Sequence, residues 1–160
     1  MDQLLTLSRL DSLDNLDDVE PITLADLLQS AVLDIWHPAQ QAGIDIRLIN
    51  HAPQVKRQGQ PLLLSLLVRN LLDNAIRYSP RGSVVDVTQD ARSFSVRDNG
   101  PGVDPEVLAR IGERFYRPPG QNATGSGLGL SIVRRIAALH GMHVSLSNAA
   151  EGGFEVKVSW

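Results

Sequence analysis

The stretch that decides the fold is Asn70-Leu71-Leu72-Asp73-Asn74-Ala75-Ile76-Arg77-Tyr78. Pro61 opens this segment and a Ser-Pro-Arg-Gly sequence follows it, so we predict a long helix over residues 61–78. Asn70 and Asn74 are four residues apart and therefore project from one face of that helix. Asparagine is unfavourable inside a helix, because its amide competes with the backbone for hydrogen bonds. Two interpretations stay open: a buried amide pair satisfied by backbone, or two neutral oxygens that ligate Mg²⁺ beside phosphate groups.

A glycine-containing turn follows a predicted strand further along the chain. Residues 93–97 read as a strand, and Asp98-Asn99-Gly100-Pro101-Gly102 comes directly after them. The two glycines, Gly100 and Gly102, allow a ligand to approach the backbone closely. Asp98 can accept a hydrogen bond from an amino group such as that of adenine. An ordinary Asp-Asn-Gly-Pro turn is the alternative.

A third motif, Gly125-Ser126-Gly127-Leu128-Gly129-Leu130, runs into a predicted helix over residues 128–140. Free backbone N–H groups and the positive end of a helix dipole make such a junction an anion site. No Gly-Lys-Ser/Thr follows, so the motif is not a P-loop. A flexible hinge is the alternative. Residues 113–120 hold aromatic side chains and Arg117, which can reach a phosphate.

The remaining segments indicate the fold class. We expect a helix after Thr23, its cap, with one apolar face that runs to Trp36; Pro38 should kink or interrupt it and Gly43 should end it. We predict strands over residues 44–49, 54–57, 84–88, 144–147 and 154–159, the last two as a hairpin, and a short helix near 105–112. Helices alternate with strands, yet tight turns join several strands. This pattern predicts an α+β, two-layer sandwich with a mixed, mostly antiparallel sheet covered on one face by helices.

The N-terminal residues are predicted to form a short helix followed by a linker. Leucines recur every third residue from Leu4 to Leu13, and an acidic segment over residues 14–21 reads as a linker. The leucine stripe either pads the core or ends a helix whose partner lies elsewhere.

Composition limits the function classes. The 160 residues suit one ordinary domain, and the absence of cysteine excludes disulfides, thiolate metal sites and a cysteine nucleophile. The net charge of −3 argues against a nucleic-acid partner. No apolar run approaches the roughly 18 residues that span a bilayer.

In order and spacing, the four motifs together resemble the N, G1, F and G2 boxes of the histidine kinase catalytic domain, which has the Bergerat ATP-binding fold. The resemblance covers about residues 20–160. It divides the chain into residues 1–19, similar to the end of the dimerisation (phosphoacceptor) helix plus a linker, and residues 20–160, the ATP-binding catalytic domain.

The resemblance implies an ATP and Mg²⁺ site. Asn74 would ligate Mg²⁺, Asn70 would assist at the phosphates, and Asp98 would bind the adenine amino group. Asn70 and Arg117 would be the catalytic residues, and residues 118–127 a lid over the nucleotide. The implied nucleotide-binding residues are Asn70, Asn74, Arg77, Tyr78, Asp98, Gly100, Gly102, Arg117, Gly125, Ser126, Gly127, Leu128, Gly129 and Leu130.

Position 70 bears on the reaction. ATPases that resemble this fold place a glutamate there as the base for water, and Asn70 has no useful basicity. Transfer of the γ-phosphate to another acceptor is therefore favoured over hydrolysis, and the resemblance implies that this acceptor is a histidine. A superfamily ATPase, or a nucleotide-sensing module without histidine transfer, remains the alternative.

The acceptor histidine is not in this sequence. Family acceptors precede Glu or Asp, and none of His37, His51, His140 and His143 does. We therefore expect ATP binding without autophosphorylation. The resemblance implies a parent that is a homodimeric sensor kinase of the bacterial inner membrane. Its own dimerisation domain and a response regulator would be the partners. This chain would be a soluble, monomeric, cytoplasmic piece of that parent.

Overall fold

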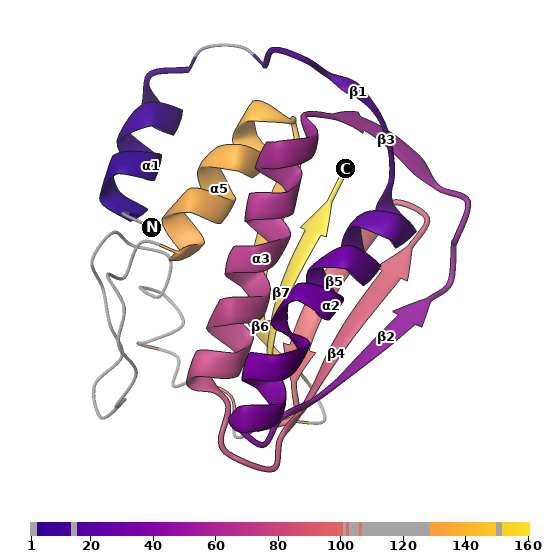
Figure 1. Ribbon diagram of the computed structural model, residues 1–160, viewed down its shortest axis with the longest axis vertical. Coiled ribbons are helices and arrows are strands. Elements are labelled where there is room, and N and C mark those ends of the chain that lie inside the picture. The colour runs from indigo at the N-terminus through magenta and orange to yellow at the C-terminus, as the bar shows by residue number, and fades with distance from the viewer. Residues whose placement is uncertain (1–2, 14–15, 101, 103–105, 107–128, 150–151) are drawn as a thin grey trace.

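A five-stranded sheet with helices on one face forms the body of the molecule (Figure 1). The computed structural model describes all residues except 1–2, 14–15, 101, 103–105, 107–128 and 150–151. Its helices are α1 (Gln3–Asp11), α2 (Leu24–Gln41), α3 (Pro61–Tyr78) and α5 (Gly129–Leu139). Its strands are β1 (Glu20–Thr23), β2 (Asp45–Asn50), β3 (Lys56–Gly59), β4 (Val84–Asp90), β5 (Ser93–Asp98), β6 (His143–Asn148) and β7 (Phe154–Ser159). Of the predicted helix over 105–112, the structure describes only Glu106, which is helical.

The sheet has the predicted mixed character. The strand order is β2-β4-β5-β7-β6, with β2 and β4 parallel and every other neighbouring pair antiparallel. Alternate residues of β4 face opposite ways, so Val85 and Val87 are fully buried beneath the helices while Asp86 lies on the other face. The hairpin of β6 and β7 is confirmed, and so is the α+β sandwich.

Helix α3 is the central helix, and its two ends agree with the sequence prediction. Pro61 occupies the first turn, where its missing N–H costs no hydrogen bond. The side chain of Gln60 caps the same end by accepting from the Leu63 N–H at 2.8 Å. Helices α2 and α5 flank α3 on the same face of the sheet (Figure 1). Leu64, Leu67 and Val68 of α3 are almost fully buried in the core between these layers.

The predictions for α2 held only in part. Thr23 stands at the cap position but makes no side-chain cap hydrogen bond; the first N–H of the helix, that of Leu24, instead donates to the Val55 carbonyl. Pro38 does not interrupt the helix, which continues to Gln41 because the fully buried Ala39 anchors the last turn. Trp36, expected in the apolar face, is 45% exposed. Gly43, with φ of 71°, follows the end of the helix as expected.

A two-stranded ribbon corrects the boundary of the acidic linker. Glu20 and Pro21, assigned to the linker, form the start of β1, which pairs antiparallel with β3. β3 covers Lys56–Gly59, two residues later than predicted. The proline is tolerated because the ribbon has only two strands, so each has a free edge.

Helix α1 packs against α5 (Figure 1). Leu7 and Leu10 are buried in the core, whereas Leu4, part of the predicted stripe, is 52% exposed. Arg135 of α5 reaches the end of α1: its Nε donates to the Leu10 carbonyl at 3.1 Å and its Nη2 to the Leu13 carbonyl at 2.5 Å. These contacts anchor α1 to the helix layer.

His140 joins the end of α5 to the start of α3. Its Nε2 accepts from the Gln60 N–H at 3.0 Å, so the ring proton of the neutral form lies on Nδ1, 2.8 Å from the Ile136 carbonyl oxygen. Burial lowers the pKa of His140 below its ordinary value, the Ile136 hydrogen bond opposes that shift, and the Arg57 charge lowers it further. The ring therefore serves as a neutral acceptor, a packing role in line with the sequence.

Candidate nucleotide site

The two asparagines of α3 meet the first residue of α5. A Cβ atom built on Gly129 would lie 3.3 Å from Oδ1 of Asn74 and 3.5 Å from Oδ1 of Asn70. Both amides therefore point toward the N-terminus of α5, where backbone N–H groups have no helical partner. Segments about 55 residues apart in the sequence thus build one polar junction.

The two amides differ in their hydrogen bonds. Asn70 is 5% exposed, and its Nδ2 donates to the Leu66 carbonyl at 2.9 Å, which leaves Oδ1 to face Gly129. Asn74 is partly buried, and its amide makes no hydrogen bond with any residue that the structure describes. The first amide is thus held in place, whereas the second is available to a ligand.

The Asp98 carboxylate is fixed on one side only. Its Oδ1 accepts from the Gly100 N–H at 2.9 Å and from the Phe154 N–H at 3.3 Å. Within the described part of the chain, nothing donates to Oδ2, although the residue is only 8% exposed. A carboxylate held this way can accept a hydrogen bond from an amino group on a ligand.

The neighbouring glycines allow close backbone packing around Asp98. A Cβ atom on Gly100 would lie 3.2 Å from both Asp98 Oδ1 and Pro80 Cδ. Gly102 has φ of 79°, and a Cβ atom there would lie 2.7 Å from Asn148 Oδ1. Gly153 is more constrained still, because a Cβ atom would lie 1.8 Å from the Asp98 carbonyl oxygen. A side chain at Gly100 or Gly153 would press on Asp98, and one at Gly102 would press on Asn148.

Other predicted site residues are placed as follows. Arg77 is exposed in the last turn of α3, and Leu130 is buried in the core at the start of α5. The Tyr78 side chain and the whole of Arg117, Gly125, Ser126, Gly127 and Leu128 lie outside the described residues.

The sequence reading missed the contribution of the C-terminal hairpin. Phe154 donates a hydrogen bond to Asp98, Gly153 packs closely against the Asp98 carbonyl, and Asn148 abuts Gly102. The Gly152-Gly153 pair was the available signal, since both residues have positive φ. The glycine pair did not indicate that Asp98 would be its neighbour, because β5 and β7 pair over a long separation in the sequence.

The donor set fits a magnesium–phosphate complex. Mg²⁺ prefers oxygen ligands and commonly takes one or two from protein while phosphates supply the rest. Two neutral amide oxygens at a helix N-terminus leave the negative charge to the phosphates. Across the described ranges, no group of three or more His, Asp or Glu side chains could hold a metal ion by itself.

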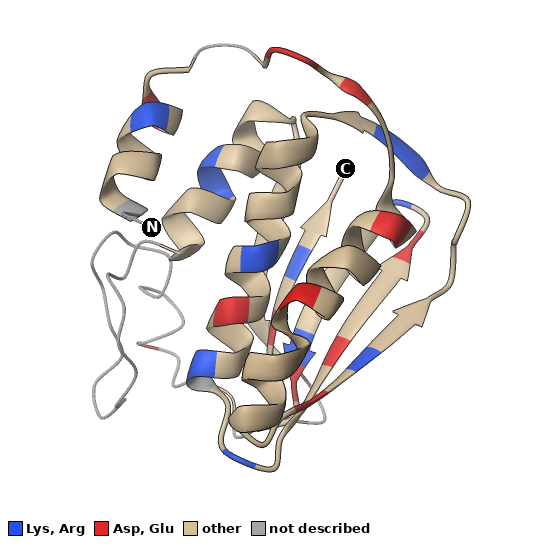
Figure 2. Ribbon diagram, viewed as in Figure 1, with Lys and Arg blue, Asp and Glu red and all other residues tan. Residues whose placement is uncertain are grey.

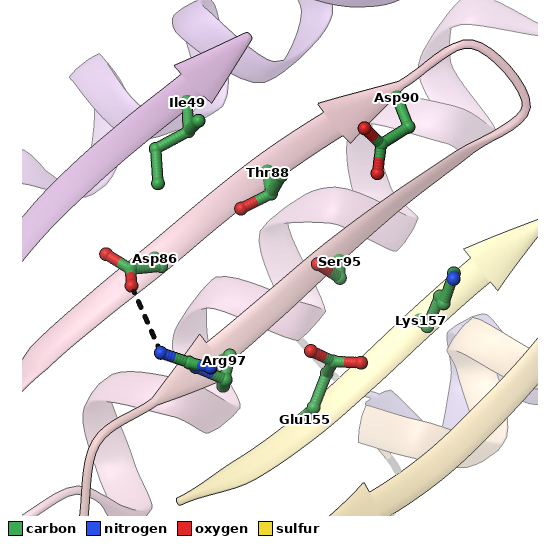
Figure 3. A pocket seen from close by; sticks show the side chains of 8 residues that line it. All are labelled: Ile49, Asp86, Thr88, Asp90, Ser95, Arg97, Glu155 and Lys157. Atoms are coloured by element: carbon green, nitrogen blue, oxygen red, sulfur yellow. Dashed lines mark ion pairs between the residues drawn. The ribbon is translucent and has the colours of Figure 1, made fainter. Parts of the chain in front are cut away.

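A hollow of about 320 Å³ lies on the opposite face of the sheet (Figure 3). It contains three acidic residues, and Asp86 is already paired with Arg47 at 2.6 Å and Arg97 at 3.7 Å. Arg97 and Lys157 also line the hollow, but the acidic side chains, which repel phosphates, outnumber them. The hollow therefore suits a nucleotide less than the junction of α3 and α5. Figure 2 shows acidic and basic residues interspersed over these strands.

Known proteins resemble this chain along its full length. Sensor protein QseC of Salmonella typhimurium is 78% identical over 160 residues, which are all of this chain and 36% of that protein. The solved cytoplasmic segment of histidine kinase QseC has a TM-score of 0.74 and 62% identity, covering 99% of this chain and 87% of that one. Full-length ShkA in complex with AMPPNP has a TM-score of 0.85 and 28% identity, covering 98% of this chain and 34% of that one.

The chain thus spans about a third of the length of the curated relatives it matches. None of the helices in the described part is long and apolar enough to cross a membrane. The profile of the histidine kinase-, DNA gyrase B- and HSP90-like ATPase family matches residues 59–160, which include both asparagines, Asp98 and the glycine motif. The chain therefore belongs to the histidine kinase-, DNA gyrase B- and HSP90-like ATPase family.

Proposed function

We propose that this chain binds Mg-ATP and donates the γ-phosphate to a histidine on a dimerisation domain. The observation that carries the proposal is the convergence of Asn70 and Asn74 on the N-terminus of α5. The half-engaged Asp98 carboxylate supports it, because it offers an acceptor for the adenine amino group. AMPPNP, an ATP analogue, is bound in ShkA, which shares this fold.

Each residue then has a separate task. Asn74 ligates Mg²⁺, and Asn70, held by the Leu66 carbonyl, positions its oxygen beside the phosphates. When bound, the ion would supply positive charge that offsets the charge of the phosphates. Exposed Arg77 supplies positive charge at the rim. Asp98 fixes the adenine base at the end of the site away from the phosphates. Arg117, Tyr78 and the glycines of residues 125–129 complete the proposed site as the family motif implies.

Asn70 favours transfer over hydrolysis. An amide does not take a proton from water at neutral pH, so a water molecule at this position is not activated. A histidine imidazole needs no such base, because its neutral nitrogen is already a nucleophile. In the parent protein the acceptor would lie on the dimerisation domain, a homodimer, and the phosphate would pass on to a response regulator.

The metal role is tested by titrating ATP with and without Mg²⁺ into wild type and Asn74→Ala. We expect Mg²⁺ to tighten ATP binding to wild type and this enhancement to fall about 10-fold or more in the variant. Asn50→Ala, an exposed amide at the end of β2, is the matched control and should behave as wild type. An unchanged Mg²⁺ enhancement in Asn74→Ala would remove the metal role.

The reaction is tested with γ-labelled ATP. The chain alone should acquire no stable acid-labile label, and addition of the relatives' dimerisation domain should produce phosphohistidine on that domain. Steady release of phosphate by the chain alone, without transfer, would establish a hydrolase instead.

A further inference from the structure

A buried hydroxyl without a partner stands beside the proposed base pocket. Ser79 follows the last residue of α3, and its N–H donates to the Ala75 carbonyl at 3.1 Å. Its side-chain Oγ is inaccessible to solvent and has no hydrogen-bond partner in the described structure. A buried hydroxyl left in this state destabilises a fold, so its presence needs a reason.

The position of Ser79 connects it to Asp98. The next residue, Pro80, has its Cδ 3.2 Å from the point where a Cβ of Gly100 would lie. Asp98 Oδ1 lies 3.2 Å from the same point. Ser79 therefore stands where the end of α3 meets the turn that fixes the aspartate. Proline also holds the preceding residue in an extended conformation, and Ser79 has φ −90° and ψ 139°.

The two residues, which both lie at this junction, differ in what they can offer a ligand. Asp98 Oδ2 can only accept, whereas the serine hydroxyl can donate. The edge of adenine carries an amino donor next to a ring-nitrogen acceptor, and guanine carries the reverse pair. A carboxylate with a neighbouring hydroxyl donor therefore matches adenine and mismatches guanine.

We propose that Ser79 is a base-selecting residue that donates a hydrogen bond to the purine ring while Asp98 accepts from its amino group. This inference rests on the proposed nucleotide function. It assigns the unpaired hydroxyl a partner that is present only when the nucleotide is bound. The hydroxyl weakens the empty protein and strengthens the complex, a trade-off typical of binding sites.

The test measures ATP and GTP affinities and the melting temperature of the empty protein for wild type and Ser79→Ala. We expect ATP affinity to fall about 5- to 10-fold, because one net hydrogen bond is lost. The ratio of ATP to GTP affinity should fall with it. The melting temperature of the empty variant should rise, because a buried unpaired group has been removed. Ser79→Thr, which keeps the hydroxyl, should retain ATP selectivity.

Ser95→Ala, on the opposite face of the sheet, is the matched control and should leave both affinities unchanged. Unchanged ATP affinity in Ser79→Ala would overturn this inference. The proposed function would still stand in that case, because wild type would bind ATP. A fall in both affinity and melting temperature would also overturn it, because the hydroxyl would then serve the fold. Failure of wild type to bind ATP would remove both proposals together.

Discussion

Removal of the Arg135 side chain should release α1 from the helix layer. The guanidinium donates to the carbonyls of Leu10 and Leu13 and lies 3.9 Å from an Asp11 carboxylate oxygen. Hydrogen bonds from a charged donor contribute about 1.5–3 kcal/mol each when well shielded. This side chain is 31% exposed, so we expect Arg135→Ala to weaken α1 docking by about 1–2 kcal/mol in total.

The assay is amide hydrogen exchange in α1. Nine residues are too few for a stable isolated helix, so α1 unfolds when it leaves α5. A loss of about 1–2 kcal/mol corresponds to about 5- to 30-fold faster exchange in α1. Exchange in the central α3 should hardly change, because its core contacts are elsewhere.

Arg134→Ala is the matched control, since Arg134 is the adjacent arginine of α5 and is exposed. It should leave exchange in α1 as in wild type. Equal acceleration in both variants would refute the anchoring role, because it would then reflect only lost charge or lost helix propensity. In Arg135→Lys, amide exchange in α1 should be faster than in wild type and slower than in Arg135→Ala, because one ammonium lacks the planar fork that reaches two carbonyls.

Two further changes test other parts of the fold. Because burial lowers the pKa of His140, the folded state binds fewer protons than the unfolded chain, whose histidines titrate at about 6.5. The stabilisation from neutral His140 is therefore complete above that pH and is lost as pH falls through it toward the folded pKa. Urea titrations between about pH 5.5 and 8 should show that the free energy of unfolding depends less on pH in His140→Gln than in wild type. The exposed control His37→Gln should keep the wild-type dependence. Gly153→Ala should abolish ATP binding and lower the melting temperature, because its Cβ would collide with the Asp98 carbonyl and φ of 98° disfavours alanine. Calorimetric titrations in which the variant binds ATP as tightly as wild type would contradict this packing.

Local signals were sufficient for the elements that carry the motifs. The bounds of α3 followed from Pro61 and from the break after Tyr78, and the period of four placed both asparagines on one face. The turn after β5 followed from Asp98 and its glycines. These features depend on residues close in sequence, so the sequence alone could predict them.

Features set by distant partners could not be predicted. β1 looked like linker because its partner strand lies about 36 residues further along the chain. Pro38 looked like a helix breaker because burial of Ala39 is invisible in local propensity. The role of Gly153 depends on the neighbouring strand, and that neighbour was unknown from the sequence. Tertiary packing decided each of these cases.

The place of β7 has a consequence for how the chain acquires its activity. This strand follows every other described strand in sequence, yet it lies between β5 and β6 within the sheet. Phe154, its first residue, holds the Asp98 carboxylate. A nascent chain that ends before residue 154 would therefore lack both this strand and one of the hydrogen bonds that hold the Asp98 carboxylate. Nucleotide would then bind only the finished fold, and ATP in the cell would favour completion of folding through its own binding energy.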